Sequence, residues 1–326
     1  MDIAFVVSRR RNFATVGSVK LLARGAAALF VVVAACGRAA PSAPAASTDA
    51  SPVSSPVAAT SLDGGLRCGE LECESFATPE AAFARVLGTK PRVLAIGETH
   101  AQKEADGGSV LSSTKRFSDA FIPLLAGHAS DLVLELWIAN GSCGKAEKAV
   151  AAAQKPVTET QAPTNQNEFI TLGDVAKKSG IRPHALIPSC DEYARILDAG
   201  GGDIDTMLSM IARLTARDLE LLLTSRADAA PDAMLLAYGG AMHNDLVPRP
   251  GREAWSFGPA MEKATAGRYV ELDLIVPEAI KDTDAWRSLP WYAHFDDTAQ
   301  RVVAQHRTLL ITLRPRSYVL VFPKSS

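Results

Sequence analysis

Two glutamates and two histidines are the residues of this sequence whose types and positions best suit catalysis. Glu98 and His100 lie in the run GETH, and His243 ends the run GAMH. Each of these histidines comes three positions after a glycine, in a chain that has only six histidines. Glu135 lies in the apolar run LVLELW, where a carboxylate needs a partner because burial without one is costly. Together the four side chains could bind and activate a water molecule.

The chemistry that this set favours is metal-dependent hydrolysis. Two imidazole nitrogens and one carboxylate, from His100, His243 and Glu98, can hold a divalent ion such as Mn, Co or Zn in an open site. Glu98 and Glu135 are the candidate catalytic groups, since a carboxylate can take a proton from the bound water. The same residues would also suit acid–base catalysis without a metal ion.

Each of the four residues also has a structural interpretation. Glu98 and His100 could cap the segment that follows them. Glu135 could form an ion pair with an arginine across the sheet, and His243 could simply open a polar loop. These alternatives stay open at the level of the sequence.

Apolar runs of strand length alternate with helical patterns from residue 92 onward, which is typical of a parallel sheet with crossover helices. The last run, RTLLITLRPRSYVLVF, predicts an antiparallel hairpin that turns near Pro315. The fold class is therefore α/β, with a mainly parallel central sheet, flanking helices and a C-terminal hairpin. In such sheets ligands bind beyond the carboxyl ends of the strands, where GETH and GAMH lie. We expect the parallel strands at residues 92–97, 131–137, 182–188, 233–239 and 269–276.

Residues 1–35 resemble a secretory signal peptide. A basic stretch precedes the apolar run GAAALFVVVAAC, which is too short to span a bilayer. The run VAAC, which ends at Cys36, resembles a bacterial lipobox, in which a diacylglycerol is attached to the cysteine before cleavage. An ordinary cleaved signal with an incidental cysteine is the alternative. The run RRNF also resembles a twin-arginine export signal.

Residues 36–65 are predicted to form a disordered tether, and residues 66–326 a single α/β domain. Within the tether, residues 39–62 are almost wholly Ala, Pro, Ser, Thr and Val. They show no periodic pattern of apolar residues that could pack against a core. A lipid on Cys36 followed by this tether would attach the domain to a membrane without embedding it. We therefore expect a lipid-anchored protein of the bacterial cell envelope, at the outer membrane or the periplasmic face.

The charge of the chain argues against a nucleic acid partner. The 326 residues carry 34 Lys and Arg against 36 Asp and Glu, a formal net charge of -2. Residues 1–35, the predicted leader, hold five basic residues and one acidic residue, +5 − 1 = +4. The rest of the chain therefore carries a net charge of (-2) − (+4) = -6. Binding to phosphates needs a clustered basic excess, which this average does not show. A small molecule or a peptide is the expected class of substrate.

Four cysteines remain in the predicted domain, which favours disulfides in an oxidising compartment. Cys68 and Cys73 are close enough in the sequence to close a small loop. Cys143 and Cys190 would then pair with each other, and two free buried thiols are the alternative for this second pair.

The motifs GETH and GAMH, with the LELW run between them, resemble the paired GxxH signature of the ChaN-like, Tiki/TraB and erythromycin-esterase superfamily. The resemblance extends to the order and spacing of the predicted strands, although its motifs are short. It implies a metal-dependent peptidase or esterase, or alternatively a lipoprotein that binds haem or a metal ion without catalytic turnover. By position, the residues that match the family's active site are Glu98, His100, Glu135 and His243.

Overall fold

The computed structural model describes residues 5–8, 66–103, 110–139, 141–159, 161–200, 203–226 and 232–325. The predicted leader, except for residues 5–8, lies outside this part of the chain, as do Cys36 and the predicted tether. Among the described residues, no helix is long and apolar enough to cross a bilayer.

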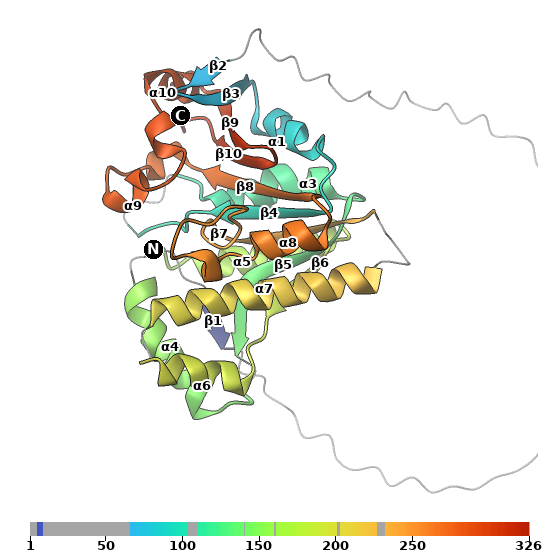
Figure 1. Ribbon diagram of the computed structural model, residues 1–326, viewed down its shortest axis with the longest axis vertical. Helices are drawn as coiled ribbons and strands as arrows, with labels where there is room; N and C mark the ends of the chain where they lie inside the picture. Colours follow the sequence, from blue (N-terminus) through green and yellow to red (C-terminus); the bar gives the residue numbers. More distant parts are fainter. Residues whose placement is uncertain are drawn as a thin grey trace, which may run out of the picture. The chain divides into compact units, whose positions relative to one another are not determined.

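One mixed sheet lies at the centre of the fold (Figure 1). Its strands follow the order β1-β5-β7-β4-β8-β10-β9-β3-β2, and β6 pairs with β5 off this path. Along this order, the pairs from β1 to β10 are parallel and those from β10 to β2 are antiparallel. The strands are β1 (Phe5–Ser8), β2 (Leu66–Cys68), β3 (Leu71–Phe76), β4 (Val93–Glu98), β5 (Ala129–Ala139), β6 (Arg182–Leu186), β7 (Met234–Gly240), β8 (Tyr269–Ile275), β9 (Thr308–Arg314) and β10 (Ser317–Val321).

The sheet confirms the predicted fold class. The five predicted parallel strands correspond to β4 through β8, and the last apolar run forms the hairpin β9–β10, which turns at Pro315 and Arg316. β4, β7 and β8 are buried along their whole length, which explains why their sequences are apolar runs rather than alternating patterns. The hairpin β2–β3 was not predicted; it adds two antiparallel strands beyond β9.

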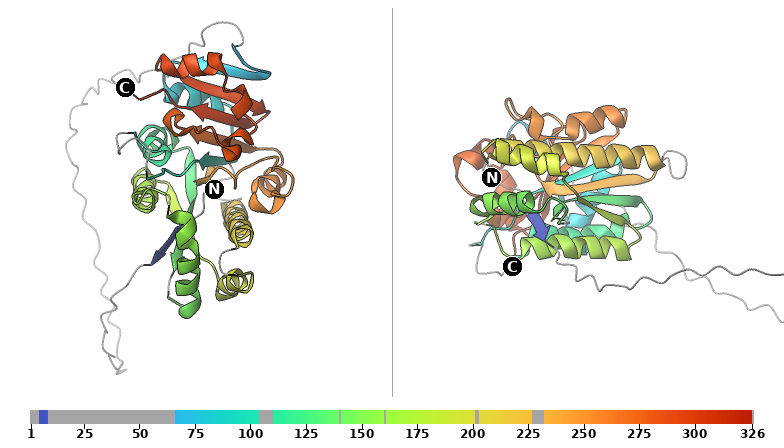
Figure 2. Two further views of the ribbon diagram at one scale, coloured as in Figure 1. Left: turned by 90° about the vertical axis from the view of Figure 1, so that its left-hand side faces the viewer. Right: turned by 90° about the horizontal axis from the view of Figure 1, so that it is seen from below.

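Helices cover both faces of the sheet, as the left view of Figure 2 shows. α3 and α5 lie on one side of the sheet, and α6, α7 and α8 lie on the other. The first side encloses an apolar core around Phe121 and Leu272, and the second a core around Trp137 and Leu214. The α-helices are α1 (Pro79–Leu87), α2 (Ser113–Arg116), α3 (Ile122–Leu125), α4 (Lys145–Thr158), α5 (Asn165–Lys178), α6 (Cys190–Asp198), α7 (Ile204–Arg226), α8 (Gly258–Ala264), α9 (Asp284–Arg287) and α10 (Asp297–Ala304).

Side-chain caps determine where two of these helices begin. At α1, Thr78 accepts a hydrogen bond from the backbone N–H of Ala81, and Pro79 takes the first helical position. At α6, Ser189 and Glu192 form a reciprocal capping box. Both caps satisfy backbone N–H groups that a helix start would otherwise leave without a partner.

The four cysteines of the domain form two disulfides, as predicted. Cys68 is bonded to Cys73 across the β2–β3 hairpin, with their Cα atoms 5.9 Å apart. Cys143 is bonded to Cys190, the first residue of α6, with their Cα atoms 5.2 Å apart. The alternative of two free thiols for the second pair is therefore wrong. This second bond joins the segment after β5 to α6, both of which follow the carboxyl ends of strands.

A buried carboxylate near the start of β5 ties this strand to β6 and α7. Asp131 is fully buried, and it accepts hydrogen bonds from Arg182 at 3.1 Å and from Arg226 at 3.2 and 3.3 Å. His184 Nε2 lies 2.8 Å from the same carboxylate. Removing one member of such a network leaves the other charges without compensation.

We expect the substitution Asp131→Asn to lower the free energy of unfolding by about 2–3 kcal/mol. The loss is no larger because the side chains that contact Asp131 are themselves partly exposed. Urea denaturation followed by circular dichroism measures this change. The exposed residue Glu220 offers a matched control on α7, where Glu220→Gln should change the free energy by less than about 0.5 kcal/mol. Equal stability of the two variants would contradict the role assigned to Asp131.

Candidate functional site

The carboxyl ends of β5, β7 and β4 lie side by side, because these strands are parallel neighbours in the sheet. Glu98, the last residue of β4, is opposite Gly240, the last residue of β7. Glu135 lies beside the same end of β7, since Leu134 is opposite Tyr238. The structure thus brings GETH, LELW and GAMH to one edge of the sheet, where ligands bind in folds of this kind.

The pleat of the sheet places the two glutamates on opposite faces. Successive side chains of a strand point to opposite sides. Glu98 therefore shares the face of Ile96, which belongs to the first core. Glu135 shares the face of Val133 and Trp137, which belong to the second core. Two separate polar groups result, one on each side of the sheet.

On the first face, Glu98 accepts hydrogen bonds from several side chains. Its Oε2 accepts from the hydroxyl of Thr114 at 2.8 Å and from that of Tyr238 at 2.9 Å. Its Oε1 lies 2.7 Å from Nδ1 of His100. Burial, followed by the charge of Glu98, raises the pKa of Tyr238 well above its usual value, so this hydroxyl keeps its proton. The carboxylate of Glu98 is thus engaged within the protein and links β4 to α2 and β7.

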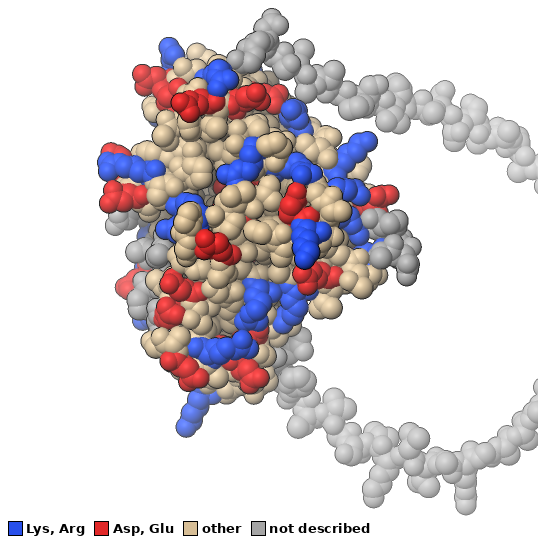
Figure 3. Space-filling view, viewed as in Figure 1, with Lys and Arg blue, Asp and Glu red and all other residues tan. Residues whose placement is uncertain are grey.

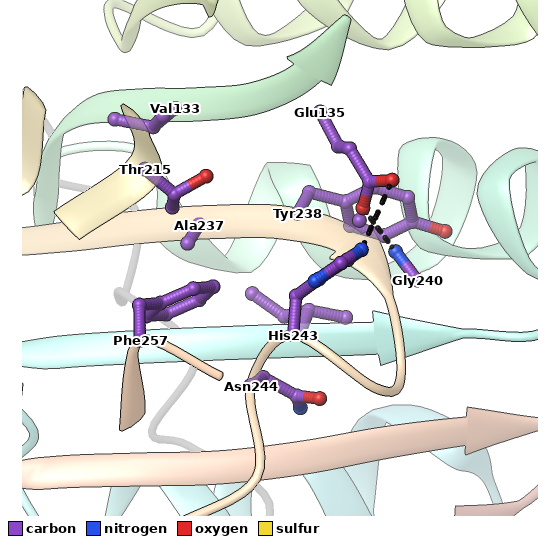
Figure 4. Close-up of a pocket in the computed structure, with 11 residues that line it drawn as sticks. Val133, Glu135, Thr215, Ala237, Tyr238, Gly240, His243, Asn244 and Phe257 are labelled. Atoms are coloured by element: carbon purple, nitrogen blue, oxygen red, sulfur yellow. Dashed lines mark hydrogen bonds and ion pairs between the residues drawn. The ribbon is translucent and has the colours of Figure 1, made fainter. Parts of the chain in front are cut away.

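On the second face, Glu135 and His243 point toward each other (Figure 4). Glu135 Oε2 accepts a hydrogen bond from the backbone N–H of Gly240 at 2.6 Å, and Glu135 Oε1 lies 3.6 Å from His243 Nε2. His243 Nδ1 lies 2.7 Å from the carbonyl oxygen of Trp255. Only 4% of Glu135 and 2% of His243 is exposed. The backbone therefore orients both side chains in a site that is nearly closed to bulk water.

The carbonyl group of Trp255 determines which nitrogen of His243 carries the proton. A carbonyl oxygen only accepts hydrogen bonds, so Nδ1 must be the donor. In the neutral ring, Nε2 then presents a lone pair toward Glu135. Neither Nε2 nor Glu135 Oε1 has a hydrogen-bond partner among the described residues. Two buried acceptors that face each other attract a proton, a water molecule or a cation.

A small cavity adjoins this pair. Its volume of about 10 Å³ is close to the room that one water molecule needs. Thr215 of α7, Val133 and Phe257 lie around it (Figure 4). The missing side chain of Gly239 makes room for the carboxylate, because a Cβ at this position would lie 2.2 Å from Oε2 of Glu135.

The predicted metal ligands Glu98, His100 and His243 are not assembled into one site. In the part of the chain that the structure describes, no three His, Cys, Asp or Glu side chains are arranged to hold a metal ion. The pleat is the physical reason, because Glu98 and His100 lie on one face of the sheet and His243 packs on the other. The structure instead pairs His100 with Glu98 and His243 with Glu135.

Several residues around the site are not among the four predicted from the sequence. Glu271 and Asp273, on the neighbouring strand β8, carried a usable signal, since they are two carboxylates in the otherwise apolar run YVELDLIV. Like Glu135, they are carboxylates in an apolar run and need a partner, because burial without one is costly. Thr215 and Trp255 gave no comparable signal, because a helix hydroxyl and a backbone carbonyl acquire a role only from the way the chain folds.

No protein-family model matches the chain, and no curated protein matches it. Among solved structures, the chain is similar to the type III effector HopBA1, with 11% sequence identity and a TM-score of 0.34. This similarity covers 76% of this chain and 94% of that chain. A similarity at this level carries no information about function. The function proposed below is based on the geometry of the site.

We expect Gly239→Ala to push the carboxylate of Glu135 away from the N–H of Gly240 and to lower the free energy of unfolding by about 1–3 kcal/mol. Chemical denaturation measures the loss, and a crystal structure of the variant would show the displaced side chain. Gly173→Ala in α5 is the control, since its Cβ would first meet a flexible leucine methyl at 3.3 Å. An unmoved Glu135 in the Gly239 variant would contradict the expectation.

Proposed function

We propose that this chain is a hydrolase of peptide or ester bonds and that Glu135 and His243 form its reaction centre. The observation that supports the proposal is that Glu135 Oε1 and His243 Nε2 are both buried without a hydrogen-bond partner in the described residues. They lie beside a cavity with room for about one water molecule. Hydrolysis requires a water molecule held next to a base, and this pair supplies the base.

His243 acts as the general base in this proposal. A water molecule in the cavity donates a hydrogen bond to Nε2, and its oxygen attacks the carbonyl carbon of the substrate. The proton passes to Nε2, while Nδ1 keeps its hydrogen bond to Trp255. The carboxylate of Glu135, at 3.6 Å from Nε2, stabilises the imidazolium that forms. The imidazolium then returns the proton to the leaving amine or alcohol.

The same pair fits part of a divalent metal site. A carboxylate oxygen and an imidazole nitrogen are suitable ligands, and both are buried without a hydrogen-bond partner in the described residues. Glu135 and His243 would hold the ion, and the Trp255 carbonyl would orient the imidazole from its other nitrogen. When bound, such an ion lowers the pKa of a water molecule and polarises a carbonyl group.

The place of the enzyme in the cell is part of the same proposal. A lipid on Cys36 would attach the domain to a membrane of the bacterial cell envelope through residues 36–65. The two disulfides support an oxidising compartment of this kind, because such bonds are rare in the reducing cytosol.

The substitution His243→Asn tests the assignment of the base. The asparagine amide can take the place of Nδ1 and donate to Trp255, but it has no atom at the place of Nε2. We expect kcat for hydrolysis to fall about 10²- to 10⁴-fold, as is usual when a general base is lost. A screen of chromogenic peptides and esters, with and without added Mn, Co and Zn salts, supplies the substrate.

His100→Asn is the comparison variant, because His100 lies with Glu98 on the opposite face of the sheet. We expect this change to lower the free energy of unfolding but to have a much smaller effect on kcat than His243→Asn has. An equal loss of kcat in the two variants, with both proteins folded, would contradict the assignment of the reaction centre to Glu135 and His243. The absence of any hydrolysis by the wild-type chain across the screen would overturn the proposed function.

Metal binding gives a prediction that does not depend on turnover. Isothermal titration with zinc chloride should show a site that Glu135→Gln and His243→Asn each weaken by more than about 100-fold, since changes in the outer shell alone cost 10- to 100-fold. Glu98→Gln should leave the Kd within about threefold, because Glu98 lies on the other face. A Kd that depends on Glu98 and not on Glu135 would contradict the fit of the metal to this pair.

A further inference from the structure

Three polar side chains project from alternate residues of β8 toward the segment that carries His243. Tyr269, Glu271 and Asp273 are all buried, at exposures of 0, 3 and 7%. Because they are two residues apart, they share one face of the strand. Tyr269 belongs to the second apolar core, so this is the face on which Glu135 lies.

Each of these side chains holds a residue of the segment directly after His243. The hydroxyl of Tyr269 donates to the carbonyl oxygen of Asn244 at 2.6 Å. Asp273 Oδ1 accepts a hydrogen bond from the side-chain amide of Asn244 at 3.0 Å. Glu271 accepts one from the backbone N–H of Leu246 at 2.7 Å. The residue next to His243 is thus held through both its backbone and its side chain.

The glycine of the GETH motif makes this contact possible. A Cβ on Gly97 would lie 2.4 Å from Asp273 Oδ1 and 2.7 Å from Asn244 Oδ1, so no larger residue fits without displacing them. Asn244 Oδ1 has no hydrogen-bond partner in the described part of the chain. The absence of a side chain at Gly97 thus leaves room for the hydrogen bond between Asn244 and Asp273.

Burial and the charges around Asp273 shift its pKa. Burial, followed by the negative charges of Glu271 and Asp245, raises the pKa of Asp273 well above its usual value. Burial likewise raises the pKa of Glu271, and it raises that of Asp245 to about 7. The cations that face these carboxyl groups and oppose the effect are Arg314, Arg249 and Arg252.

We propose that Tyr269, Glu271 and Asp273 are positioning residues, which hold the segment 243–246 on β8 and so set the distance between His243 and Glu135. Asp273 does this by accepting the hydrogen bond from the side-chain amide of Asn244. The effect on catalysis rests on the function proposed above, whereas the effect on the geometry of His243 does not.

The stability of the protein should accordingly fall as the pH rises. A group whose pKa is raised on folding contributes stability that is present below its unfolded pKa, near 3.8 for Asp, and lost as the pH rises toward its folded value. We expect the urea midpoint of the wild-type protein to be lower at pH 8 than at pH 5. Asp273→Asn, which cannot ionise, should reduce this difference.

The ring nitrogens of His243 report its position without any need for a substrate. Nitrogen-15 NMR of histidine-labelled protein, with His243 assigned from the His243→Asn variant, distinguishes a ring protonated at Nδ1 from a mixture of tautomers. We expect a single Nδ1-protonated form in the wild type and in Asp273→Asn. In Asp273→Leu, which has no polar atom to hold Asn244, we expect a mixture.

Asp131→Asn is the matched control. It also alters a buried carboxylate in a strand, but one that lies near the amino end of its strand, β5. It should destabilise the protein and leave the His243 tautomer unchanged. A folded Asp273→Leu variant with wild-type His243 signals would overturn the proposal. If Asp273→Leu does not fold, Tyr269→Phe removes only the hydrogen bond to the Asn244 carbonyl, and an unchanged His243 spectrum in that variant would also overturn it.

Kinetics supply the second readout. A misplaced base lowers kcat rather than substrate affinity, so Asp273→Leu should lower kcat more than about tenfold with KM within about threefold. Asp273→Asn should restore kcat to within about threefold of the wild type. If the wild type hydrolyses nothing but the NMR result holds, then the proposed function fails and the positioning role stands.

Discussion

A carboxylate in a strand that is covered on both faces needs a hydrogen-bond donor inside the protein, because water does not reach it. In the described residues this constraint acts on Glu98, Asp131, Glu135, Glu271 and Asp273, which are all at least nine-tenths buried. Their donors come from other parts of the chain, namely α2, β6, α7, the last residue of β7 and the segment after β7. These carboxylates therefore join the sheet to the helices and loops around it.

The two polar groups at the carboxyl ends of the strands, around Glu98 and around Glu135, differ in how many of their carboxylate oxygens have a hydrogen-bond partner. Both oxygens of Glu98 lie within hydrogen-bond distance of a neighbouring side chain, which makes it a link between elements. Glu135 has one oxygen bound to a backbone N–H and the other directed at His243, with no hydrogen bond between them. An unmet hydrogen bond at a buried site costs stability, so it is most readily explained by a function. On the face that Figure 3 shows, charged side chains of both signs are interspersed over the surface.

Much of the fold followed from patterns that are local in the chain. Apolar runs of strand length are sufficient to locate β4 through β8. In β4, β7 and β8 the run is continuous because a strand buried on both faces does not alternate apolar and polar residues. The partners of Cys143 and Cys190 remained open at that level, since their contact depends on how β5 and α6 pack. The hairpin β2–β3 was missed because its residues alternate only weakly and it is stabilised by pairing with the distant strand β9.

The sequence by itself determined the fold class, the strand positions and the two glutamates and two histidines at strand ends. Only the tertiary structure decided which of them meet. Strand order brings β5, β7 and β4 together, and the pleat then directs Glu98 and Glu135 to opposite faces. The tertiary structure also decided that Trp255 and β8 orient His243. A backbone carbonyl and a strand far along the chain act on this side chain only after the polypeptide has folded.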